Sequence, residues 1–282
     1  MADKIDQLVE QYRNGTLNRR EFMKKLAIAA GGTVLVTLLP GHRTALAASG
    51  KVPGSRLLNE FITYPGETGE IRAYKSVLKG RKKRPAVIII HENRGLVPHI
   101  QDVTRRMAAE GFLAMAPDAL SPLGGTPEDE NQGRTMIGQL NRETTVKNFV
   151  AAVKYLKTHP RSTGKVGCTG FCWGGAMTNQ VAVSCDEIDA AVPYYGSTPS
   201  PDDVPQIKAP IMAHYAGNDE RINAGIPAFE EALKKAGIEY HIFIYEGASH
   251  AFNNDTSERY NKEAAELAWS RTVAFFKEKL KK

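Results

Sequence analysis

The chain has 282 residues, of which 42% are hydrophobic and 24% are charged, as is typical of soluble globular domains with a substantial core. Its formal net charge is +6. Residues 1–47 carry seven basic and four acidic side chains, and residues 48–282 carry 30 basic and 27 acidic ones. This balance excludes an extended nucleic-acid-binding surface, and no apolar run reaches the roughly 18–20 residues that membrane insertion requires.

Residues 1–47 have the order of a bacterial export signal. Arg19 and Arg20 precede a moderately apolar stretch at 26–39 and a small-residue site at Ala45-Leu46-Ala47. Adjacent arginines are typical of the twin-arginine pathway. We therefore expect a periplasmic or secreted protein that uses the twin-arginine machinery. The alternative is a cytoplasmic protein that keeps an amphipathic N-terminal helix.

Residues 48–282 predict a single domain. Residues 58–64 and 70–78 are β-like runs that predict an antiparallel hairpin. The continuous apolar run at 86–90 is typical of a strand buried on both faces. A helix near 100–110 and a second buried strand at 112–116 follow. Residues 121–142 are polar and rich in Gly, Pro and Asn, which predicts a long surface loop.

The second half of the domain alternates between helices and strands. Helices are predicted at 144–156, 174–184, 226–235 and 262–280, and strands at 165–169, 190–195, 211–215 and 240–245. This alternation predicts an α/β fold with a mostly parallel sheet and helices on both faces. In such sheets the site lies at the carboxyl ends of the strands, so the residues just after each strand are the candidates.

The strand at 165–169 is followed by Gly170-Phe171-Cys172-Trp173-Gly174-Gly175, which matches a nucleophile elbow with Cys in place of Ser. The elbow places Cys172 at a helix N-terminus, where the dipole favours the thiolate. The alternative is an ordinary glycine-rich turn with a buried cysteine. The odd count of three cysteines does not predict a disulfide framework, and no second Cys/His pair completes a zinc site.

Two further residues complete a candidate catalytic triad. Asp219 follows the strand at 211–215 and His250 follows the strand at 240–245, so the chain order is nucleophile, acid, histidine, as in α/β-hydrolases. We expect His250 to accept the thiol proton and later to activate water, with Asp219 holding the imidazole in the useful tautomer. Asp118, Asp202 and Asp203 are rival acids that are less well placed.

The oxyanion of an acyl-transfer intermediate needs two backbone N–H donors. We expect them from Trp173 and from Asn93, in the loop after the strand at 86–90. Glu92 of the same loop is expected beside the sulfur, where its carboxylate holds the thiol proton in the resting enzyme. The alternative is an ion pair of Glu92 with Arg94 or another surface cation.

Several of these motifs carry a family resemblance. From about residue 58 to its C-terminus the chain resembles the dienelactone hydrolases (carboxymethylenebutenolidases) of the α/β-hydrolase superfamily. The shared pieces are His91-Glu92-Asn93-Arg94-Gly95, Ala116-Pro117-Asp118, Gly170-Phe171-Cys172-Trp173-Gly174-Gly175, Tyr194-Tyr195-Gly196 and Ser249-His250-Ala251-Phe252. The resemblance implies a Cys-Asp-His triad, a resting thiol paired with Glu92, and no metal or organic cofactor.

The resemblance also implies a substrate pocket. Family members that act on dienelactones hold the substrate carboxylate with arginines, one of them a few residues past the triad histidine. In this chain Asn254 stands in that region, and Arg134 is the candidate for the other arginine. Arg94 and Tyr195 are further candidates for the pocket.

The sequence therefore favours a hydrolase that cleaves a small-molecule ester or lactone through a thioester acyl-enzyme. Two alternatives stay open: a non-catalytic binding protein on the same scaffold, and a thiol acyltransferase. Tight ligand binding with a Cys172 that is unreactive toward iodoacetamide would indicate the first. Transfer of the acyl group to an amine or alcohol in preference to water would indicate the second.

Overall fold

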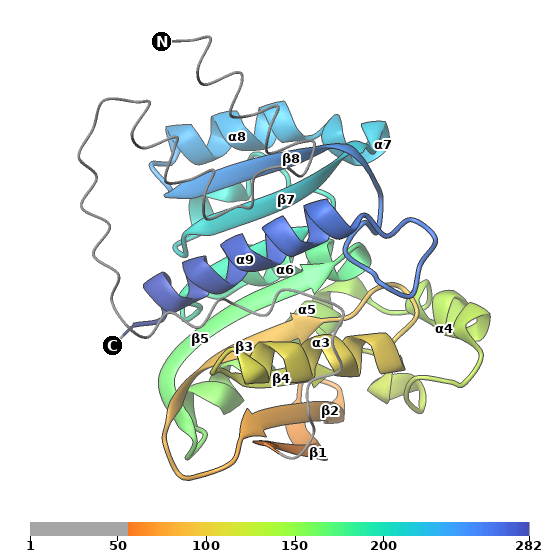
Figure 1. The fold of residues 1–282 in the computed structure, drawn as a ribbon, viewed down its shortest axis with the longest axis vertical. Helices are drawn as coiled ribbons and strands as arrows, with labels where there is room; N and C mark the ends of the chain where they lie inside the picture. Colours follow the sequence, from red (N-terminus) through yellow and green to blue (C-terminus); the bar gives the residue numbers. More distant parts are fainter. Residues whose placement is uncertain (1–55, 282) are drawn as a thin grey trace, which may run out of the picture. The chain divides into compact units, whose positions relative to one another are not determined.

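The computed structural model describes residues 56–281, and the expected export signal at 1–47 lies outside the described residues. An eight-stranded sheet forms the centre of this part of the chain (Figure 1). The strand order is β1-β2-β4-β3-β5-β6-β7-β8, with antiparallel pairing of β1 with β2 and of β2 with β4, and parallel pairing elsewhere. The strands are β1 (Leu57–Gly66), β2 (Gly69–Leu78), β3 (Arg84–Ile90), β4 (Leu113–Pro117), β5 (Ser162–Phe171), β6 (Ala190–Tyr194), β7 (Ile211–Asn218) and β8 (Tyr240–Ser249).

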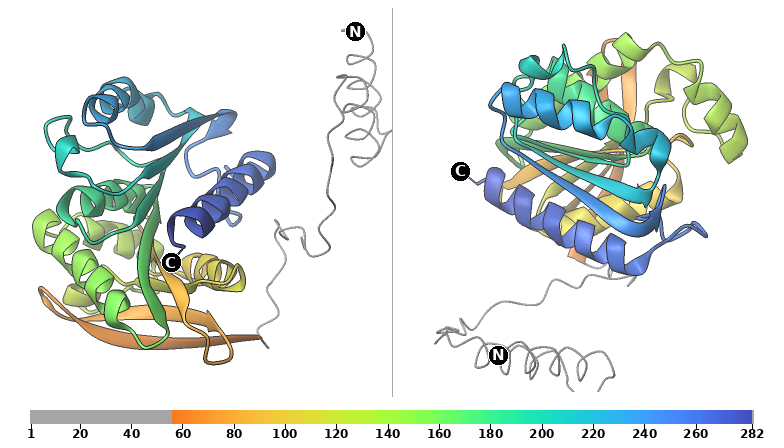
Figure 2. Two further views of the ribbon diagram at one scale, coloured as in Figure 1. Left: turned by 90° about the vertical axis from the view of Figure 1, so that its left-hand side faces the viewer. Right: turned by 90° about the horizontal axis from the view of Figure 1, so that it is seen from above.

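Helices cover both faces of the sheet (Figure 2). One face carries α3 (Pro98–Ala109) and α9 (Lys262–Lys279), and the other carries α5 (Arg142–Thr158), α6 (Trp173–Ser184) and α8 (Ile226–Lys235). Shorter helical segments lie in the connections that follow β4, β6 and β7; they are η2 (Ser121–Leu123), α4 (Glu130–Ile137), η3 (Val204–Gln206) and α7 (Glu220–Asn223). The predicted α/β-hydrolase fold, with a mostly parallel sheet covered on both faces, is confirmed.

Strand β3 shows how the sequence requires this double cover. Ile88 and Ile90 belong to the core that contains α5, α6 and α8, whereas Val87 and Ile89 belong to the core that contains α3 and α9. All four side chains are 0% exposed. Successive side chains of a strand point to opposite faces, so a continuous apolar run is stable only where both faces are covered. Each such burial contributes roughly 1.5–3 kcal/mol.

The long surface loop predicted over residues 121–142 is wrong in part, because it contains α4. Asp129 caps this helix by accepting a hydrogen bond from the backbone N–H of Asn131 at 2.8 Å. A Cβ on Gly133 would lie 2.6 Å from the carbonyl oxygen of Arg94, so α4 packs closely on the loop after β3. Glycine and asparagine have low helix propensity, and with only eight residues the helix gives a weak periodic pattern, so the sequence did not indicate it.

Strands β7 and β8 run further than predicted, to Asn218 and Ser249, and these two residues are partners across the sheet. The extra length matters for the site. It brings Asp219 and His250, the next residues of each segment, to the same end of two adjacent strands.

Candidate active site

Cys172 occupies the turn between β5 and α6. Its backbone φ of 56° and ψ of −115° are unusual for a residue with a Cβ. Its N–H donates to the carbonyl oxygen of Tyr194, at the end of β6, over 3.1 Å. Strain of this kind costs of the order of 1–3 kcal/mol and persists only where the surroundings determine it. The turn therefore has the strained backbone of a nucleophile elbow.

The glycines that flank the elbow let backbone approach backbone. A Cβ on Gly174 would lie 2.4 Å from the carbonyl oxygens of both Ile90 and His91, and a Cβ on Gly175 would lie 2.3 Å from the carbonyl oxygen of Tyr194. No side chain fits at either position. The first turn of α6 is consequently pressed against the ends of β3 and β6, which brings the loop after β3 up to Cys172.

His250 and Asp219 meet at the ends of β8 and β7. Nδ1 of His250 lies 2.5 Å from Oδ2 of Asp219, and the two side chains are 21% and 9% exposed. The carboxylate can accept only while Nδ1 carries a proton, which leaves Nε2 free to accept one. The structure thus brings together the two residues that the sequence singled out as base and orienting acid.

The thiol of Cys172 is half-buried, and among the hydrogen bonds of residues 56–281 none joins its sulfur to His250. Burial raises the pKa of this thiol to about 11, and the negative charge of Glu92 acts in the same direction. The backbone N–H of Trp173 and the nearby Arg221 oppose this rise in pKa. Because loss of solvent outweighs the helix N-terminus, the resting site holds a protonated thiol near neutral pH.

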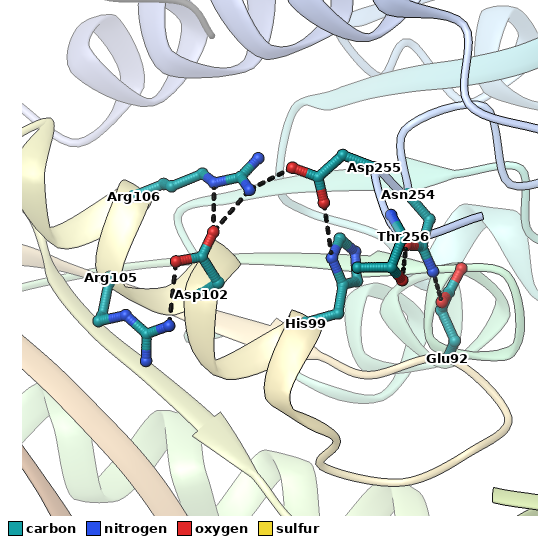
Figure 3. A network of polar contacts seen from close by, with 8 residues as sticks. All are labelled: Glu92, His99, Asp102, Arg105, Arg106, Asn254, Asp255 and Thr256. Atoms are coloured by element: carbon teal, nitrogen blue, oxygen red, sulfur yellow. Dashed lines mark hydrogen bonds and ion pairs between the residues drawn. The ribbon is translucent and has the colours of Figure 1, made fainter. Parts of the chain in front are cut away.

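Glu92 lies in the loop after β3 and is 8% exposed. Its Oε2 accepts a hydrogen bond of 2.7 Å from the side-chain amide of Asn254 (Figure 3). Burial raises the pKa of Glu92, and the amide and Arg94 oppose the rise. The ion pair considered between Glu92 and Arg94 is absent from the described contacts, since the guanidinium of Arg94 lies 3.4 Å from Glu130 of α4 instead.

His91 fixes the conformation of this loop. Its Nε2 accepts a hydrogen bond of 3.1 Å from the backbone N–H of Ala119, so the ring proton sits on Nδ1 and is donated to the carbonyl oxygen of Glu92 over 2.6 Å. The ring is fully buried and stacks on Trp173 at 5.4 Å between centroids. His91 is therefore a structural histidine that ties the loop after β3 to the loop after β4 and to the elbow.

Both backbone N–H groups expected in the oxyanion hole are available. The N–H of Trp173 is the first of α6, which has no partner within the helix, and the N–H of Asn93 donates to no group among the described residues. Each lies beside a residue of the candidate site, Cys172 for the first and Glu92 for the second.

Asp118, the rival acid after β4, has a different set of partners. Its carboxylate accepts hydrogen bonds from the backbone N–H of Leu120 at 3.0 Å and from the backbone N–H and hydroxyl of Thr126 at 2.9 and 2.7 Å. The same threonine hydroxyl accepts from the backbone N–H of Leu96 at 2.7 Å. Asp118 therefore organises two loops around the site.

The other residues predicted in the pocket differ in their surroundings. Tyr195 is 1% exposed, and its ring centroid lies 5.1 Å from that of His250. Its hydroxyl is buried and has no partner among the described residues. Arg134 is exposed on the last turn of α4, the helix whose Gly133 packs on the loop after β3.

Two features of the site were not predicted from the sequence. The first is the contact of Asn254 with Glu92, which lies 162 residues away in the chain. The second is Arg221, whose charge acts on the sulfur of Cys172 and which lies two residues after Asp219. Position relative to Asp219 was the available signal for Arg221, whereas no local pattern indicates the contact of Asn254.

In residues 56–281 no group of three or more His, Cys, Asp or Glu side chains is arranged to hold a metal ion. Over the same residues no helix has the length and apolar character needed to cross a membrane.

A family profile and curated relatives indicate the same family. The profile of the dienelactone hydrolase family matches residues 71–280. A protein of Saccharolobus solfataricus named "Putative carboxymethylenebutenolidase" is 31% identical over 258 residues, covering 78% of this chain and 98% of its own length. A protein of the same name from Escherichia coli is 30% identical over 244 residues, covering 81% and 90%. The crystal structure of "Putative Dienelactone Hydrolase" from Klebsiella pneumoniae has a TM-score of 0.71 at 26% identity and covers 78% of this chain and 98% of its own.

Proposed function

Since the chain belongs to the dienelactone hydrolase family and is therefore a hydrolase acting on ester or lactone bonds, we propose that Cys172 is its nucleophile, with His250 as base and Asp219 as the orienting acid. The observation that carries the proposal is the hydrogen bond between His250 and Asp219 at the end of the sheet where the strained elbow of Cys172 also lies. The substrate is a small-molecule ester or lactone.

In the first half of the reaction His250 takes the proton of the Cys172 thiol on Nε2, and the sulfur attacks the acyl carbon. The carbonyl oxygen becomes an oxyanion, which the backbone N–H groups of Trp173 and Asn93 stabilise. The tetrahedral intermediate collapses to a thioester, the bond to the leaving oxygen breaks, and His250 donates a proton to that oxygen. In a lactone the leaving oxygen stays attached to the acyl group, so the ring opens on the enzyme.

In the second half His250 removes a proton from water, and the resulting hydroxide attacks the thioester carbon. The second tetrahedral intermediate uses the same two N–H donors. Collapse releases a carboxylic acid and returns the proton to the sulfur. Asp219 keeps the ring proton on Nδ1 throughout, so that Nε2 faces the reacting atoms in both halves.

Glu92 acts before the chemistry begins. Its charge opposes ionisation of Cys172, and its burial favours its own protonated form, so sulfur and carboxylate tend to keep a proton between them. Such a site stores the thiol in its less reactive form until substrate enters. The nucleophile is thereby protected from oxidants and alkylating agents in the empty enzyme.

The test compares Cys172→Ala and Cys172→Ser with the wild type on nitrophenyl acetate and on a panel of neutral lactones. We expect the alanine variant to lose turnover while its thermal unfolding stays close to that of the wild type. Mass spectrometry of the wild type quenched during turnover should find an acyl adduct on Cys172. Full activity of Cys172→Ala would exclude this mechanism, and transfer to added amine in preference to water would indicate an acyltransferase.

We also propose that the chain is exported by the twin-arginine machinery to the periplasm or beyond. Support comes from the order of Arg19-Arg20, the apolar stretch and the small-residue site in residues 1–47. The test replaces both arginines with lysine and follows the protein by cell fractionation in a bacterial host with the pathway. Export should stop in the double variant. Equal distribution of the two proteins between fractions would contradict the proposal.

A further inference from the structure

Three consecutive residues, Asn254, Asp255 and Thr256, lie in the loop between β8 and α9, and their side chains make different contacts (Figure 3). Asn254 contacts Glu92 in the candidate active site, Asp255 contacts helix α3, and Thr256 contacts Asn254. This segment therefore joins the loop of His250 to the loop of Glu92 at a second place.

The orientation of the Asn254 amide is determined by its partners. Its Oδ1 accepts hydrogen bonds from the backbone N–H of Thr256 at 3.0 Å and from the hydroxyl of the same residue at 2.7 Å. A backbone N–H can only donate, so this end of the amide must be the oxygen. The amino group must then face Glu92, and Oε2 of Glu92 must be an acceptor in this contact.

The contact of Asn254 leaves the two oxygens of Glu92 unequal. Oε2 accepts from the amide over 2.7 Å, whereas Oε1 accepts no hydrogen bond from any residue of 56–281. A proton held by Glu92 is consequently placed on Oε1, because a proton on Oε2 would compete with the amide hydrogen. The charged and titratable groups that act on Glu92 or feel its charge are Cys172, Tyr195, Arg94 and Glu130.

Asp255 docks the segment on α3. One carboxylate oxygen contacts the guanidinium of Arg106, and the other lies 3.2 Å from Nδ1 of His99. Asp255 is 16% exposed and Arg106 is 26% exposed, so the pair is shielded more than an ordinary surface pair. Asp102 holds the other side of the same guanidinium through Nε at 2.6 Å, which fixes the position of Arg106 on the helix.

Both partners of the contact between Asn254 and Glu92 are thus anchored to one helix. Glu92 lies in the loop that leads into α3, whose first residue is Pro98, and Asn254 directly precedes Asp255. The ion pair closes a ring of contacts through α3. Groups held in such a ring lose less freedom when they meet, so the geometry around the carboxylate is set before substrate arrives.

We propose that Asn254 and Asp255 are positioning residues for the nucleophile: Asp255 docks on Arg106 and His99, and this holds the Asn254 amide on Oε2 of Glu92, so that Oε1 is left to accept the hydrogen bond of the Cys172 thiol in the resting site. The inference rests on the proposed role of Glu92 as the resting partner of the thiol. Neither residue touches the substrate in this scheme. Their effect reaches the sulfur through Glu92 alone.

The experiment measures the rate of Cys172 alkylation by iodoacetamide from pH 6 to 10 in the full chain, with mass spectrometry at that residue. Iodoacetamide is neutral, so changes of charge in the site act on the thiol and not on approach of the reagent. Glu92→Gln removes the charge beside the sulfur and should speed alkylation near pH 8 by about tenfold, which corresponds to one unit of pKa.

Asn254→Ala removes a hydrogen bond to the charged form of Glu92, which then stays protonated to higher pH. We expect alkylation to be faster by about threefold, between the rates of the wild type and of Glu92→Gln. Asp255→Asn should act in the same direction. Arg106→Met should follow Asp255→Asn, while Arg106→Lys, which keeps a cation for Asp255, should restore much of the wild-type profile.

A double variant distinguishes a positioning role of Asn254 from a general loosening of the structure around the site. The double variant Glu92→Gln/Asn254→Ala should match Glu92→Gln, because Asn254 acts only through the carboxylate. The matched control is Asp189→Asn, since Asp189 is 15% exposed and binds two cations, Lys157 and Lys165, at the start of β6, at the opposite end of the strand from the site. This variant should keep the wild-type profile.

The outcomes are distinguishable. If Glu92→Gln leaves alkylation unchanged, the proposed role of Glu92 is wrong and the inference fails with it. If Glu92→Gln speeds alkylation but Asn254→Ala and Asp255→Asn follow the wild type, the inference alone is overturned. Equal effects of Asp189→Asn and Asp255→Asn, or additive effects in the double variant, would also overturn it.

Discussion

Asp118 and Asp219 both follow a strand of the same sheet and are both nearly buried, but Asp219 accepts from the imidazole of His250 whereas Asp118 accepts from the backbone of its own loop. Sequence position alone made them rivals for one role. Their hydrogen-bond partners distinguish the two roles, so substitution of Asp219 and of Asp118 should have different effects on activity and stability.

Asp219→Asn should cost activity and leave the fold intact. An asparagine can donate to Nδ1 of His250, which stabilises the tautomer with its proton on the wrong nitrogen. We expect kcat on nitrophenyl acetate to fall roughly 10²–10⁴-fold, with a thermal midpoint within a few degrees of the wild type. Asp203→Asn, the same change at the start of η3, is the control and should keep activity within about twofold. Wild-type kcat in Asp219→Asn would remove Asp219 from the mechanism.

Asp118→Asn should reduce stability more than it reduces activity. An amide in place of the carboxylate turns one acceptor toward Leu120 and Thr126 into a donor, leaving a buried N–H group unpaired. The expected cost is about 1–3 kcal/mol, measured by urea denaturation. Activity should fall only modestly, through the bond from Leu96 to Thr126. The opposite pattern, with activity abolished at unchanged stability, would make Asp118 the catalytic acid.

The close approach of α6 to β3 predicts a severe effect of Gly174→Ala. The new Cβ would meet two carbonyl oxygens at 2.4 Å, and both belong to backbone that cannot turn aside. We expect a loss of about 2–4 kcal/mol in the free energy of unfolding, together with loss of activity because the elbow moves. Gly138→Ala is the matched control.

At Gly138 the backbone is helical, with φ of −66°, and the nearest atom to an added Cβ is the carbonyl oxygen of Thr135 at 3.3 Å. The control should therefore change stability by less than about 1 kcal/mol. Equal stability of the two alanine variants would show that the first turn of α6 can shift, which would contradict a tightly packed elbow.

The sequence predicted the sheet, and the positions of Cys172, Asp219 and His250 relative to its strands, because those features follow from local patterns. The buried run at 86–90 and the alternation of helices and strands require no knowledge of distant contacts, and the same holds for the placement of Cys172, Asp219 and His250 after strands. Helix α4 was not predicted, because the packing of Gly133 on the loop after β3 leaves no periodic pattern in the sequence.

The partner of the Glu92 carboxylate is a second feature that the sequence did not predict. Arg94 is two residues away and was considered as its counter-ion, whereas the contact found is to Asn254, and Arg94 turns to Glu130. Proximity in sequence says little about which polar groups meet in a folded chain, because tertiary packing decides which side of a loop faces inward. Long-range polar contacts of this kind depend on the folded structure, and no local sequence pattern indicates them.

A buried histidine behind the site gives a prediction for acid stability. His214 is 0% exposed, and it lies between the hydroxyls of Tyr245 at 2.9 Å from Nδ1 and Thr272 at 3.0 Å from Nε2. Burial, with a smaller contribution from the charge of Arg271, lowers the pKa of this histidine to about 3. The unfolded chain therefore binds a proton at His214 between about pH 3 and pH 6.5 that the folded chain does not bind.

The sign of the pH dependence follows from that difference. Because the unfolded state binds more protons in this window, the contribution of His214 to stability is complete above about pH 6.5 and is lost as the pH falls toward 3, with a slope of up to about 1.4 kcal/mol per pH unit. Urea denaturation of the wild type and of His214→Gln from pH 4.5 to 7.5 measures it. The variant should be less stable at pH 7.5 but should lose stability more slowly on acidification. His241→Gln, at an exposed position of β8, is the control and should keep the wild-type slope. Parallel curves for wild type and His214→Gln would mean that the buried ring takes up its proton without unfolding.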